Sequence, residues 1–364
     1  MSGTSIDSVD YALCEIDERQ VRLVELWNAD FPKWMQNDLH AAARGELPSW
    51  EFSQLHHELG RFYAQHAVRG KKKPTLAGLH GQTVFHNPSK KNPATLQLGE
   101  PVYLAAKLGA TVINNFRVAD MALGGQGAPL ATIFHQFVFG EKGKHVCVNN
   151  LGGISNVTSL NWSKGAKPSV MAFDTGPANV LIDMAMRHFS SGKKAFDKNG
   201  AAAARGKANE TLLQGWLRHP YFKQTPPKST GRELFGEPFF KEIFEKLRTL
   251  GDHDAVATLT EFTARSVALN YKLHLPSAPD RVVLAGGGAA NPVLVRAIGR
   301  ALSEAFPKKS VELKTSADLG WPVQAIEPAA FALLAWLRVN GRPGNLPETT
   351  GAQRAVLCGQ ITQV

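Results

Sequence analysis

The sequence predicts an α/β protein built from two similar halves, and three observations support this prediction. Strand-like segments alternate with helix-like segments along most of the chain. Each half opens with two extended segments around a turn rich in Gly, Ser or Thr, first within residues 2–31 and again within 145–160. A further glycine turn, LAGGGAAN, joins a strand to a helix at 284–291. Such a duplication favours two related domains with a cleft between them.

The composition is that of a globular protein with a sizeable core. Of the 364 residues, 43% are apolar and 20% are charged. The chain is long enough for two α/β domains of ordinary size. The sequence contains neither a run of eighteen apolar residues nor a secretory signal, so we expect no membrane association. The three cysteines, Cys14, Cys147 and Cys358, are widely spaced and without CxxC pattern. They predict free thiols in a reducing compartment, and therefore a cytoplasmic protein.

The net charge of +10 favours acidic partners. The densest basic cluster, RGKKKP at 69–74, precedes the apolar segment TLAGL and is interpreted as a solvated turn between a helix and a strand. Nucleic-acid binding would require basic residues spread over a face with aromatic residues among them, or a known module, and the sequence has neither. An anionic small-molecule substrate fits the charge equally well, and we expect no binding of nucleic acid.

The first domain is predicted to span residues 1–135. Residues 9–17 and 20–31 alternate as two antiparallel strands do. In the predicted helix 50–68, one apolar face carries Phe52, Leu55, Leu59, Phe62 and Tyr63. Further elements follow in order: a strand at 75–79, a strand at 94–99, a helix at 101–109 and a strand at 111–116.

The second domain is predicted to span residues 136–340, with the boundary near 130–145. Its elements are a strand pair at 145–160, a strand at 169–174, helices at 178–189 and 253–271, a strand, glycine turn and helix at 281–302, and a last helix at 327–339. We expect the helix at 253–271 to bury the side that carries Val256, Leu259, Phe262, Thr263, Ser266 and Val267. The tail 340–364 is expected to pack back onto the first domain.

Three glycine-bearing turns are candidates for phosphate binding: SGTSIDS (2–8), NLGGISNV (150–157) and LAGGGAAN (284–291). Glycine lets a ligand approach the backbone, and serial N–H groups with hydroxyls can hold phosphate oxygens. One such turn alone is weak support, but three indicate a nucleotide site. AGGGAAN lacks the GxGxxG spacing, and PPKST at 226–230 has prolines where a P-loop needs glycine, so neither of those nucleotide-binding classes is favoured.

Two carboxylates are candidates for chemistry. Asp7 lies in the first turn, where it could meet a phosphate-bound Mg²⁺ through water or simply cap the turn. Asp174 ends a predicted strand, at the edge where α/β proteins bind ligands. It could take a proton from water or a hydroxyl, or it could cap the following helix together with Thr175. The residues leave both alternatives open.

Four other polar residues each allow more than one role. His80 and His86 are not spaced as a helical metal pair and are expected in polar, non-metal roles. Arg117 could bind a carboxylate or phosphate, or pair with Asp120 three residues later. Glu327, placed just before a predicted helix, could bond sugar hydroxyls or interact with the helix dipole.

Together these stretches resemble the anhydro-N-acetylmuramic acid kinase family. The resemblance runs through nearly the whole chain in one order and is carried by MSGTSIDSVD, GLHGQTVFH, TLQLGEP, NNFRVADMALGGQGAPL, NNLGGISNVT, AFDTGPANVLID, PPKSTGRELF, LAGGGAAN and GRPGNLPETTGA. It implies the fold of sugar kinases, actin and heat-shock ATPases: two related actin-like ATPase (ribonuclease H-like) domains with a nucleotide cleft between them. A homodimer is what the family suggests.

The resemblance also implies the reaction and the residues that serve it. Members hydrolytically open 1,6-anhydro-N-acetylmuramic acid and phosphorylate it from ATP with Mg²⁺, giving N-acetylmuramic acid 6-phosphate in cell-wall recycling. Asp174 matches the catalytic base, and Asp7 is expected to reach Mg²⁺ through water. The expected nucleotide contacts are Gly3, Thr4, Ser5, Ile6, Asp7, Ser8, Gly152, Gly153, Ser155, Asn156, Gly286, Gly287 and Gly288. The expected sugar contacts are Gln82, Thr95, Arg117 and Glu327.

The sequence departs from the family pattern at three points. The strand that usually precedes MSGTS is missing, which would leave an unpaired edge in the first domain. Ser8 and Ala178 stand where the family usually has glycine, and a left-handed φ at Ser8 would cost about 1 kcal/mol. Two alternatives therefore remain: a non-catalytic sugar or nucleotide sensor of the same fold, and a kinase for another amino sugar.

Overall fold

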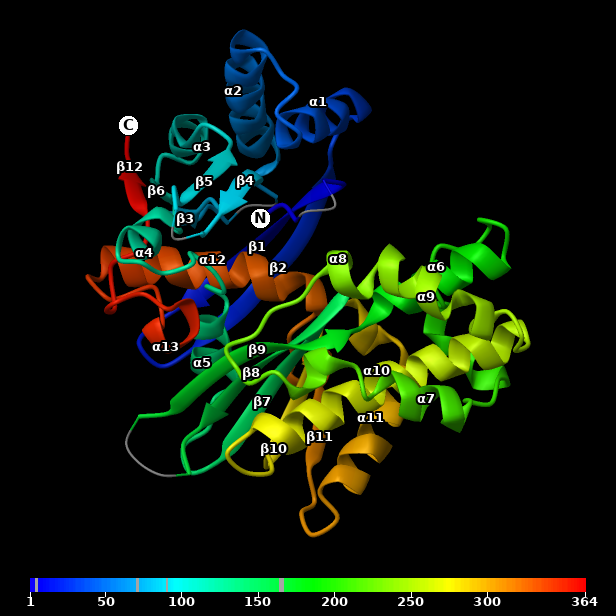
Figure 1. Ribbon diagram of the computed structural model, residues 1–364. Helices are drawn as coiled ribbons and strands as arrows, with labels where there is room; N and C mark the ends of the chain where they lie inside the picture. Colours follow the sequence, from blue (N-terminus) through cyan, green and yellow to red (C-terminus); the bar gives the residue numbers. More distant parts are fainter. Residues whose placement is uncertain (4–5, 70–71, 90, 164–166) are drawn as a thin grey trace. The chain divides into compact units, whose positions relative to one another are not determined.

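The computed structural model describes residues 1–364 except 4–5, 70–71, 90 and 164–166. The chain divides into two compact units. Unit 1 comprises Met1–Val138 and Gln324–Val364, and unit 2 comprises Phe139–Val323. Each unit combines β-sheets with packed helices (Figure 1), so the predicted α/β class is confirmed.

Unit 1 contains three small sheets. The hairpin β1–β2 is antiparallel, β6 lies between β3 and β12, and β4 pairs with β5. The elements are β1 (Ser8–Ile16), β2 (Val21–Asp30), α1 (Lys33–Ala43), α2 (Ser49–His66), β3 (Leu76–Gly78), β4 (Gln82–Asn87), β5 (Ala94–Leu98), α3 (Pro101–Leu108), β6 (Thr111–Asn114), α4 (Val118–Ala122), α5 (Thr132–Phe139, ending at the unit boundary), α12 (Val323–Val339), α13 (Pro347–Thr350) and β12 (Gln360–Thr362).

The core of unit 1 forms against the apolar face predicted for α2. Leu55, Leu59, Phe62 and Tyr63 are buried there, and Phe52 is half-buried against the same cluster. These residues are three or four positions apart, so one side of the helix carries them all. The helix therefore forms where the periodicity predicts it.

The second unit boundary lies at 323/324 and not at residue 340, because α12 packs on unit 1. A methyl group on Gly78 of β3 would lie 2.2 Å from the carbonyl oxygen of Phe331, so the helix lies directly on this strand. The centre of the Phe331 ring also lies 4.5 Å from the centre of the His80 ring and 5.2 Å from that of Phe116. The tail returns to the same unit, where β12 runs antiparallel to β6, and both are seen together in Figure 1.

Unit 2 is built on one five-stranded sheet in the order β11-β10-β7-β8-β9. β10 is parallel to β7 and β11, whereas β7, β8 and β9 are antiparallel neighbours. The elements are β7 (His145–Leu151), β8 (Ile154–Asn161), β9 (Ser169–Pro177), α6 (Asn179–Phe189), α7 (Glu210–Trp216), α8 (Arg232–Phe235), α9 (Glu237–Leu247), α10 (Asp252–His274), β10 (Arg281–Ala285), α11 (Pro292–Ala305) and β11 (Glu312–Thr315). Short 3-10 turns lie at Lys198–Gly200, Ala203–Arg205, Pro220–Lys223, Gly287–Ala290 and Ala317–Leu319.

Helix α10 forms the centre of this unit. The six residues expected to lie on its inner side, Val256, Leu259, Phe262, Thr263, Ser266 and Val267, are all buried. The apolar ones join two clusters: Val256, Leu259 and Phe262 pack around α6 and α9, and Val267 packs against the sheet. This packing fixes β9 and the segment 220–235, which carry the residues described below.

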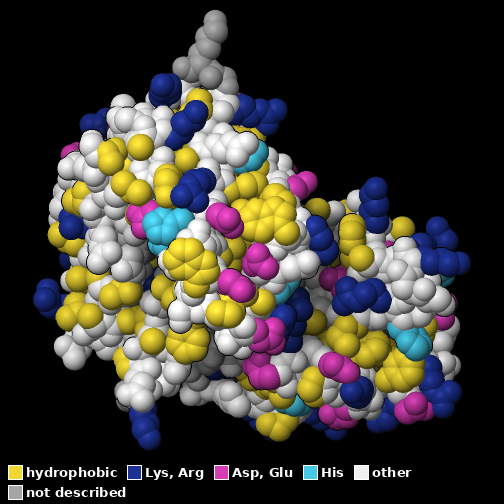
Figure 2. Space-filling view, turned by 90° about the horizontal axis from the view of Figure 1, so that it is seen from above, with side chains coloured by type: hydrophobic (Ala, Val, Ile, Leu, Met, Phe, Trp, Pro, Cys, Tyr) yellow, Lys and Arg dark blue, Asp and Glu magenta, His cyan; other side chains and the backbone are white. Residues whose placement is uncertain are grey.

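Basic side chains do not gather on the face viewed in Figure 2. Lys and Arg are scattered there among acidic, histidine and apolar side chains. Among the described residues, no helix combines the length and the apolar composition that crossing a membrane requires.

Candidate active site

Asp174 lies beside a bulge in β9, not at the end of its strand as the sequence predicts. Across the β8–β9 pair, Asp174 is opposite Asn156, while Gly176 is opposite Ser155, so Thr175 is the extra residue. The strand continues to Pro177. A bulge of this kind bends the strand and redirects side chains, and it is common beside active sites.

The segment 221–230 holds the backbone and side chain of Asp174. The Thr230 N–H donates to Oδ2 of Asp174 at 2.8 Å. The Asp174 N–H donates to the carbonyl of Lys228 at 3.1 Å, and the Tyr221 hydroxyl donates to the carbonyl of Asp174 at 2.8 Å. The alternative role in capping α6 is wrong, because the N-cap residue of α6 is Ala178 and no side chain accepts a capping hydrogen bond there.

Burial raises the pKa of Asp174 to about 6, since the carboxylate loses hydration. The nearby Glu233 carboxylate adds to the rise, and the hydrogen bond from Thr230 opposes it. A carboxyl group with this pKa is ionised at neutral pH and is basic enough to accept a proton in a reaction.

Lys228 is a site residue that the sequence analysis missed. Its Nζ atom donates to the carbonyls of Tyr221 and Phe222, each at 3.3 Å, and lies 3.1 Å from Nε2 of His274. It also stands 4.8 Å from the centre of the Tyr221 ring, and burial lowers its pKa to about 8. The signal for Lys228 was the motif PPKSTGRELF, whose prolines do not fit a P-loop and which belongs to the stretches that resemble the family.

The two glycine turns of unit 2 lie together. Nδ2 of Asn179 donates to the carbonyls of Leu151 and Gly152, at 2.9 and 2.8 Å. A methyl group on Gly288 would lie 2.7 Å from Cβ of Leu151 and 3.1 Å from Oδ1 of Asn179. The structure therefore brings NLGGISNV and LAGGGAAN, which are more than a hundred residues apart, to one corner of the sheet.

The glycines in these turns serve different purposes. A methyl group on Gly286, whose φ is +79°, would clash with Asn150 and Leu151, and one on Gly288 would lie too close to Leu151. In contrast, methyl groups on Gly152 and Gly153 would have no neighbour closer than 3.5 and 3.9 Å, and one on Gly287 would meet nothing within 4 Å. Packing explains Gly286 and Gly288, whereas the backbone of the other three is open to a ligand.

Ser155 and Asn156 also differ. The Ser155 hydroxyl is buried, and it accepts from Nδ2 of Asn149 at 2.8 Å and from the Thr175 hydroxyl at 2.6 Å. It joins β7 to the bulge in β9, so its side chain is committed to positioning the strand. Asn156 is half-buried and lies opposite Asp174. Of the two residues, it is the better candidate for a ligand contact.

In the first turn, Thr4 and Ser5 lie outside the described residues. The Gly3 carbonyl accepts from the Ile6 N–H at 3.3 Å and from Nε2 of Gln82 at 3.2 Å. Asp7 has an exposed side chain, and its carbonyl accepts from the Phe31 N–H at 2.9 Å. Among the described residues, no group of three His, Cys, Asp or Glu side chains could hold a metal ion.

The expected strain at Ser8 is absent. Ser8 begins β1 and pairs with Asp30. The left-handed conformation falls on Ile6, with φ +58°, two residues earlier. Ala178, the other glycine replacement, has φ −114°, so an alanine side chain causes no left-handed strain there.

Arg117 is held by His80 and by a loop carbonyl, not by Asp120. Nη1 donates to the Gly127 carbonyl at 2.7 Å, while Nη2 and Nε lie 2.9 and 3.3 Å from Nε2 of His80. Because guanidinium nitrogens only donate, Nε2 accepts and Nδ1 of His80 donates to the Gly81 carbonyl at 2.7 Å. Burial, with Arg117 adding to it, keeps the pKa of His80 well below its usual value, and the ring is neutral.

Asp120 is instead a structural residue. It is fully buried and accepts from the Gly127 N–H at 2.8 Å, from Nδ2 of Asn345 at 2.7 Å and from the Thr350 hydroxyl at 2.6 Å. These bonds connect the loop after α4 to the C-terminal tail. Because Asp120 is engaged in these bonds and does not bind Arg117, the Arg117 guanidinium keeps N–H groups that neither His80 nor Gly127 uses.

The other predicted sugar contacts lie in two places. Gln82 is fully buried, and its Oε1 atom has no hydrogen-bond partner among the described residues. Thr95 lies on the β4–β5 hairpin, where its hydroxyl bonds His86 at 3.0 Å and accepts from Gln97 at 2.7 Å. It shares a small cavity of about 140 Å³ with His80, which neither Gln82 nor Arg117 lines.

Glu327 lies inside α12, because this helix begins at Val323, four residues earlier than predicted. Its side chain is solvent-exposed, yet the dense protein around it raises its pKa. The Met1 ammonium and Arg117 act in the opposite direction, which places both positive charges near this carboxylate.

Known proteins similar to this chain indicate its family. A family model described as anhydro-N-acetylmuramic acid kinase matches residues 1–364. Relatives carrying that name include one from Acaryochloris marina, 40% identical over 376 residues (99% of this chain, 98% of the relative), and one from Gloeobacter violaceus, 41% identical over 375 residues (99% and 97%). A ROK family glucokinase structure from Streptomyces griseus, in complex with glucose and AMPPNP, covers 90% of this chain and 96% of its own at 13% identity and a TM-score of 0.37. The chain belongs to the anhydro-N-acetylmuramic acid kinase family.

Proposed function

We propose that this chain opens the 1,6-anhydro bridge of anhydro-N-acetylmuramic acid with water and phosphorylates the released 6-oxygen from ATP. The observation that carries the assignment is Asp174, a half-buried carboxylate on a β-bulge, with a pKa raised to about 6 and one oxygen fixed by the Thr230 N–H. Membership in the family supplies the substrate and the phosphotransferase reaction.

Asp174 serves as the general base. It removes a proton from water as the water oxygen bonds to the anomeric carbon and the bond from that carbon to the 6-oxygen breaks. The electron pair of the broken bond stays on the 6-oxygen, which attacks the terminal phosphorus of ATP as ADP leaves. The Thr230 N–H engages Oδ2 of Asp174, so the second oxygen, Oδ1, is the one that faces the water.

The open glycines are the proposed nucleotide contacts. Gly152, Gly153 and Gly287 leave room for phosphate or nucleoside against their backbone. In unit 1 the first turn supplies Gly3 and the exposed carboxylate of Asp7, whose oxygen donors suit Mg²⁺ reached through water. When bound, Mg²⁺ neutralises charge on the phosphate oxygens.

The proposed sugar contacts in unit 1 are polar groups with hydrogen-bonding capacity that the described residues do not fully use. Arg117 is oriented by His80 and Gly127 and keeps further N–H donors, which suit the lactyl carboxylate of the substrate. The unpaired Oε1 atom of buried Gln82 suits a hydroxyl or amide donor of the sugar, because an unpaired buried acceptor is costly. Glu327 and Thr95 supply further acceptors.

We also infer a cytoplasmic location from the free thiols of Cys14, Cys147 and Cys358.

The test is direct. The full chain is incubated with ATP, Mg²⁺ and anhydro-N-acetylmuramic acid, and ADP and the 6-phosphate sugar are measured. We expect the two products in equal amounts. Calorimetry that shows both ligands binding, without product, would support the sensor alternative, and turnover of a different amino sugar alone would reassign the substrate.

A further inference from the structure

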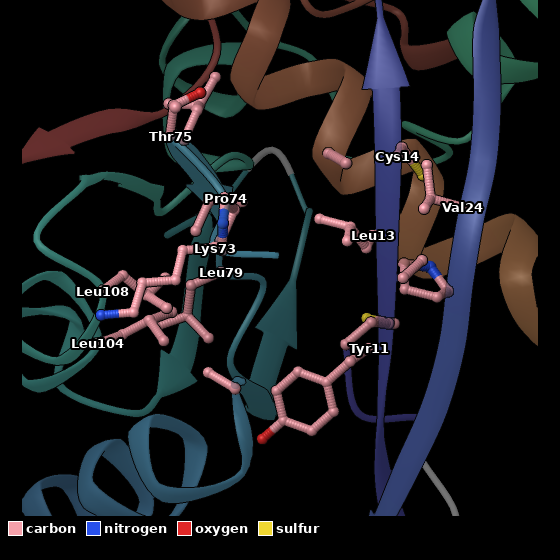
Figure 3. A pocket seen from close by; sticks show the side chains of 18 of the residues that line it. Tyr11, Leu13, Cys14, Val24, Lys73, Pro74, Thr75, Leu79, Leu104 and Leu108 are labelled. Carbon is pink, nitrogen blue, oxygen red and sulfur yellow. The ribbon is translucent and has the colours of Figure 1, made fainter. Parts of the chain in front are cut away.

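The glycine turn between β7 and β8 suits a phosphate group better than a cavity in unit 1 does. This cavity, of about 430 Å³, lies between β1 and β3, and Figure 3 shows Leu13, Leu79 and Leu104 among its lining side chains. Its charged side chains are two acidic and two basic ones, Asp10, Glu15, Lys72 and Lys73. Apolar walls and balanced charges give an anion little to bind. In unit 2, by contrast, an unbalanced positive charge borders the open turn.

The turn between β7 and β8 has room for a ligand, and its carbonyl oxygens are already hydrogen-bonded. A methyl group on Gly153 would have no neighbour closer than 3.9 Å. The Gly153 carbonyl accepts from the N–H groups of Ala178 and Val180 at 2.9 and 3.1 Å. The Gly152 carbonyl accepts from the Asn179 N–H at 3.0 Å. Because the N–H groups at the start of α6 cover these oxygens, the turn does not repel an anion.

Arg232 borders this turn with an uncommitted guanidinium. Its Nη2 atom would lie 4.0 Å from a methyl group on Gly153, so it faces the same open space. The side chain is solvent-exposed and, among the residues that the structure describes, it forms no hydrogen bond and no ion pair. A guanidinium carries five N–H donors and always keeps its charge, so this one is available to an anionic ligand.

Asp183 is an electrostatic neighbour of this arginine and not its ion-pair partner. Burial raises the pKa of Asp183 to about 6, and the positive charges of Arg187 and Arg232 oppose the rise. Neither arginine forms an ion pair with this carboxylate in the described part of the chain, and Arg187 instead donates to the Ala195 carbonyl at 3.3 Å. Two arginines therefore share one acidic neighbour, and of the two it is Arg232 that borders the glycine turn.

The segment that carries Arg232 also holds the catalytic base. Thr230, two residues earlier, fixes Oδ2 of Asp174 through its N–H at 2.8 Å. In the proposed reaction, the 6-oxygen of the sugar is released beside Asp174 and attacks the terminal phosphorus of ATP. The terminal phosphoryl group is then the part of ATP nearest to Asp174. Arg232 starts beside Thr230 and reaches Gly153, so it is placed to meet this group.

We propose that Arg232 binds the terminal phosphoryl group of the nucleoside triphosphate and stabilises the charge on its oxygens during transfer. This inference rests on the proposed function. The bond from the 6-oxygen to phosphorus forms, the bond from phosphorus to ADP breaks, and no proton moves to or from Arg232. A guanidinium can bind two phosphate oxygens at once, which a lysine cannot do in the same geometry.

Nucleotide binding tests this assignment without the sugar. Calorimetry gives the dissociation constants of ATP and ADP, each with Mg²⁺, for the full chain, Arg232→Met and Arg187→Met. We expect Arg232→Met to weaken ATP binding about 10–100-fold and ADP binding by less than about twofold, because ADP lacks the group that Arg232 contacts. Equal effects on ATP and ADP, or no effect on either, would overturn the proposal.

Arg187→Met is the matched control, because it removes the same charge from the surroundings of Asp183 without touching the glycine turn. It should leave both dissociation constants unchanged. Arg232→Lys should recover part of the ATP affinity, since it restores the charge but not the fork. The urea midpoints of these variants should equal that of the full chain, because both arginines are exposed.

Turnover separates this inference from the proposed function. We expect kcat to fall about 10²–10³-fold in Arg232→Met, because charge on the transferring group loses a positioned donor. A full chain that forms the 6-phosphate sugar, with an unchanged kcat in Arg232→Met, would overturn the role of Arg232 and leave the function standing. A full chain that forms no product, yet binds ATP more tightly than Arg232→Met does, would overturn the reaction and retain Arg232 as a triphosphate contact.

Discussion

Oδ2 of Asp174 accepts a hydrogen bond from the N–H of Thr230, 56 residues later in the chain, at 2.8 Å. This bond connects the β-bulge in β9 to the segment PPKSTGRELF and fixes one oxygen of the carboxylate. The other oxygen, Oδ1, is the one that the proposed reaction would use.

Replacing Asp174 by Asn should abolish most turnover while leaving the fold intact. The amide cannot accept the proton, and a positioned general base contributes about 10²–10⁴-fold to rate. Turnover and ATP binding by calorimetry measure the two effects. Asp252→Asn, an equivalent change at an exposed position of α10 in the same unit, is the control and should remain active. Near-normal turnover in Asp174→Asn would remove this residue from the mechanism.

The pH profile should report the ionisation of Asp174. Because its raised pKa is about 6, the base is ionised above pH 6, and kcat/KM should fall as the pH is lowered through that value. Glu233→Gln removes a nearby negative charge that favours the protonated form. We therefore expect the acidic limb of Glu233→Gln to move to lower pH. A limb that stays in place, or moves upward, would contradict the assignment.

Lys228→Met should lower both stability and activity. The change removes one donor from the carbonyls of Tyr221 and Phe222, which keep the Gln224 N–H and Nε2 of His274 within hydrogen-bond distance, so we expect a loss of about 0.5–1.5 kcal/mol of unfolding free energy. It also loosens Thr230, whose hydrogen bond lowers the pKa of Asp174, so the acidic limb should move to higher pH. Urea unfolding and the pH profile measure these effects.

Lys223→Met is the matched control for this change, because Lys223 is exposed in the same segment. It should leave the stability and the pH profile as they are. A Lys228→Met protein with normal stability and an unchanged acidic limb would show that Lys228 does not position the base.

The two neighbouring glycines Gly287 and Gly288 should respond differently to alanine. A methyl group on Gly287 meets nothing within 4 Å, so Gly287→Ala should fold normally but raise the KM for ATP. A methyl group on Gly288 would lie 2.7 Å from Cβ of Leu151, so Gly288→Ala should lose about 1–3 kcal/mol of stability. Thermal unfolding and ATP kinetics separate the two. An unchanged KM in Gly287→Ala would show that no ligand approaches this backbone.

Ser8→Gly should not repair the first turn. Ser8 lies in a strand opposite Asp30, where glycine costs about 0.5–1 kcal/mol because of its larger backbone entropy when unfolded. We expect a slightly lower urea midpoint and unchanged turnover. A gain in stability would mean that the backbone at this position prefers a left-handed φ.

The family, the α/β class and most elements could be predicted from the sequence. Residue type and periodicity specify these features locally, as in α2, where apolar residues three and four positions apart identify the buried face. Asp174 was identified because its motif stands between a strand and a helix. The motif could not show the bulge at Thr175, since a bulge is a mismatch between two strands and not a property of one.

Other features were decided by the tertiary structure alone. Periodicity gave α12 correctly as a helix but could not assign it to unit 1, because that depends on the close approach between Gly78 and Phe331, about 250 residues apart. Glycine content marked Gly286, Gly287 and Gly288 alike, yet only packing separates the crowded positions from the open one. Residue pattern alone identified segments such as α2, α10 and α12 as helices, but it did not identify α1, α9, β4 or β11. Only the folded chain decided which of these meet, because contacts between distant segments depend on the shapes of both.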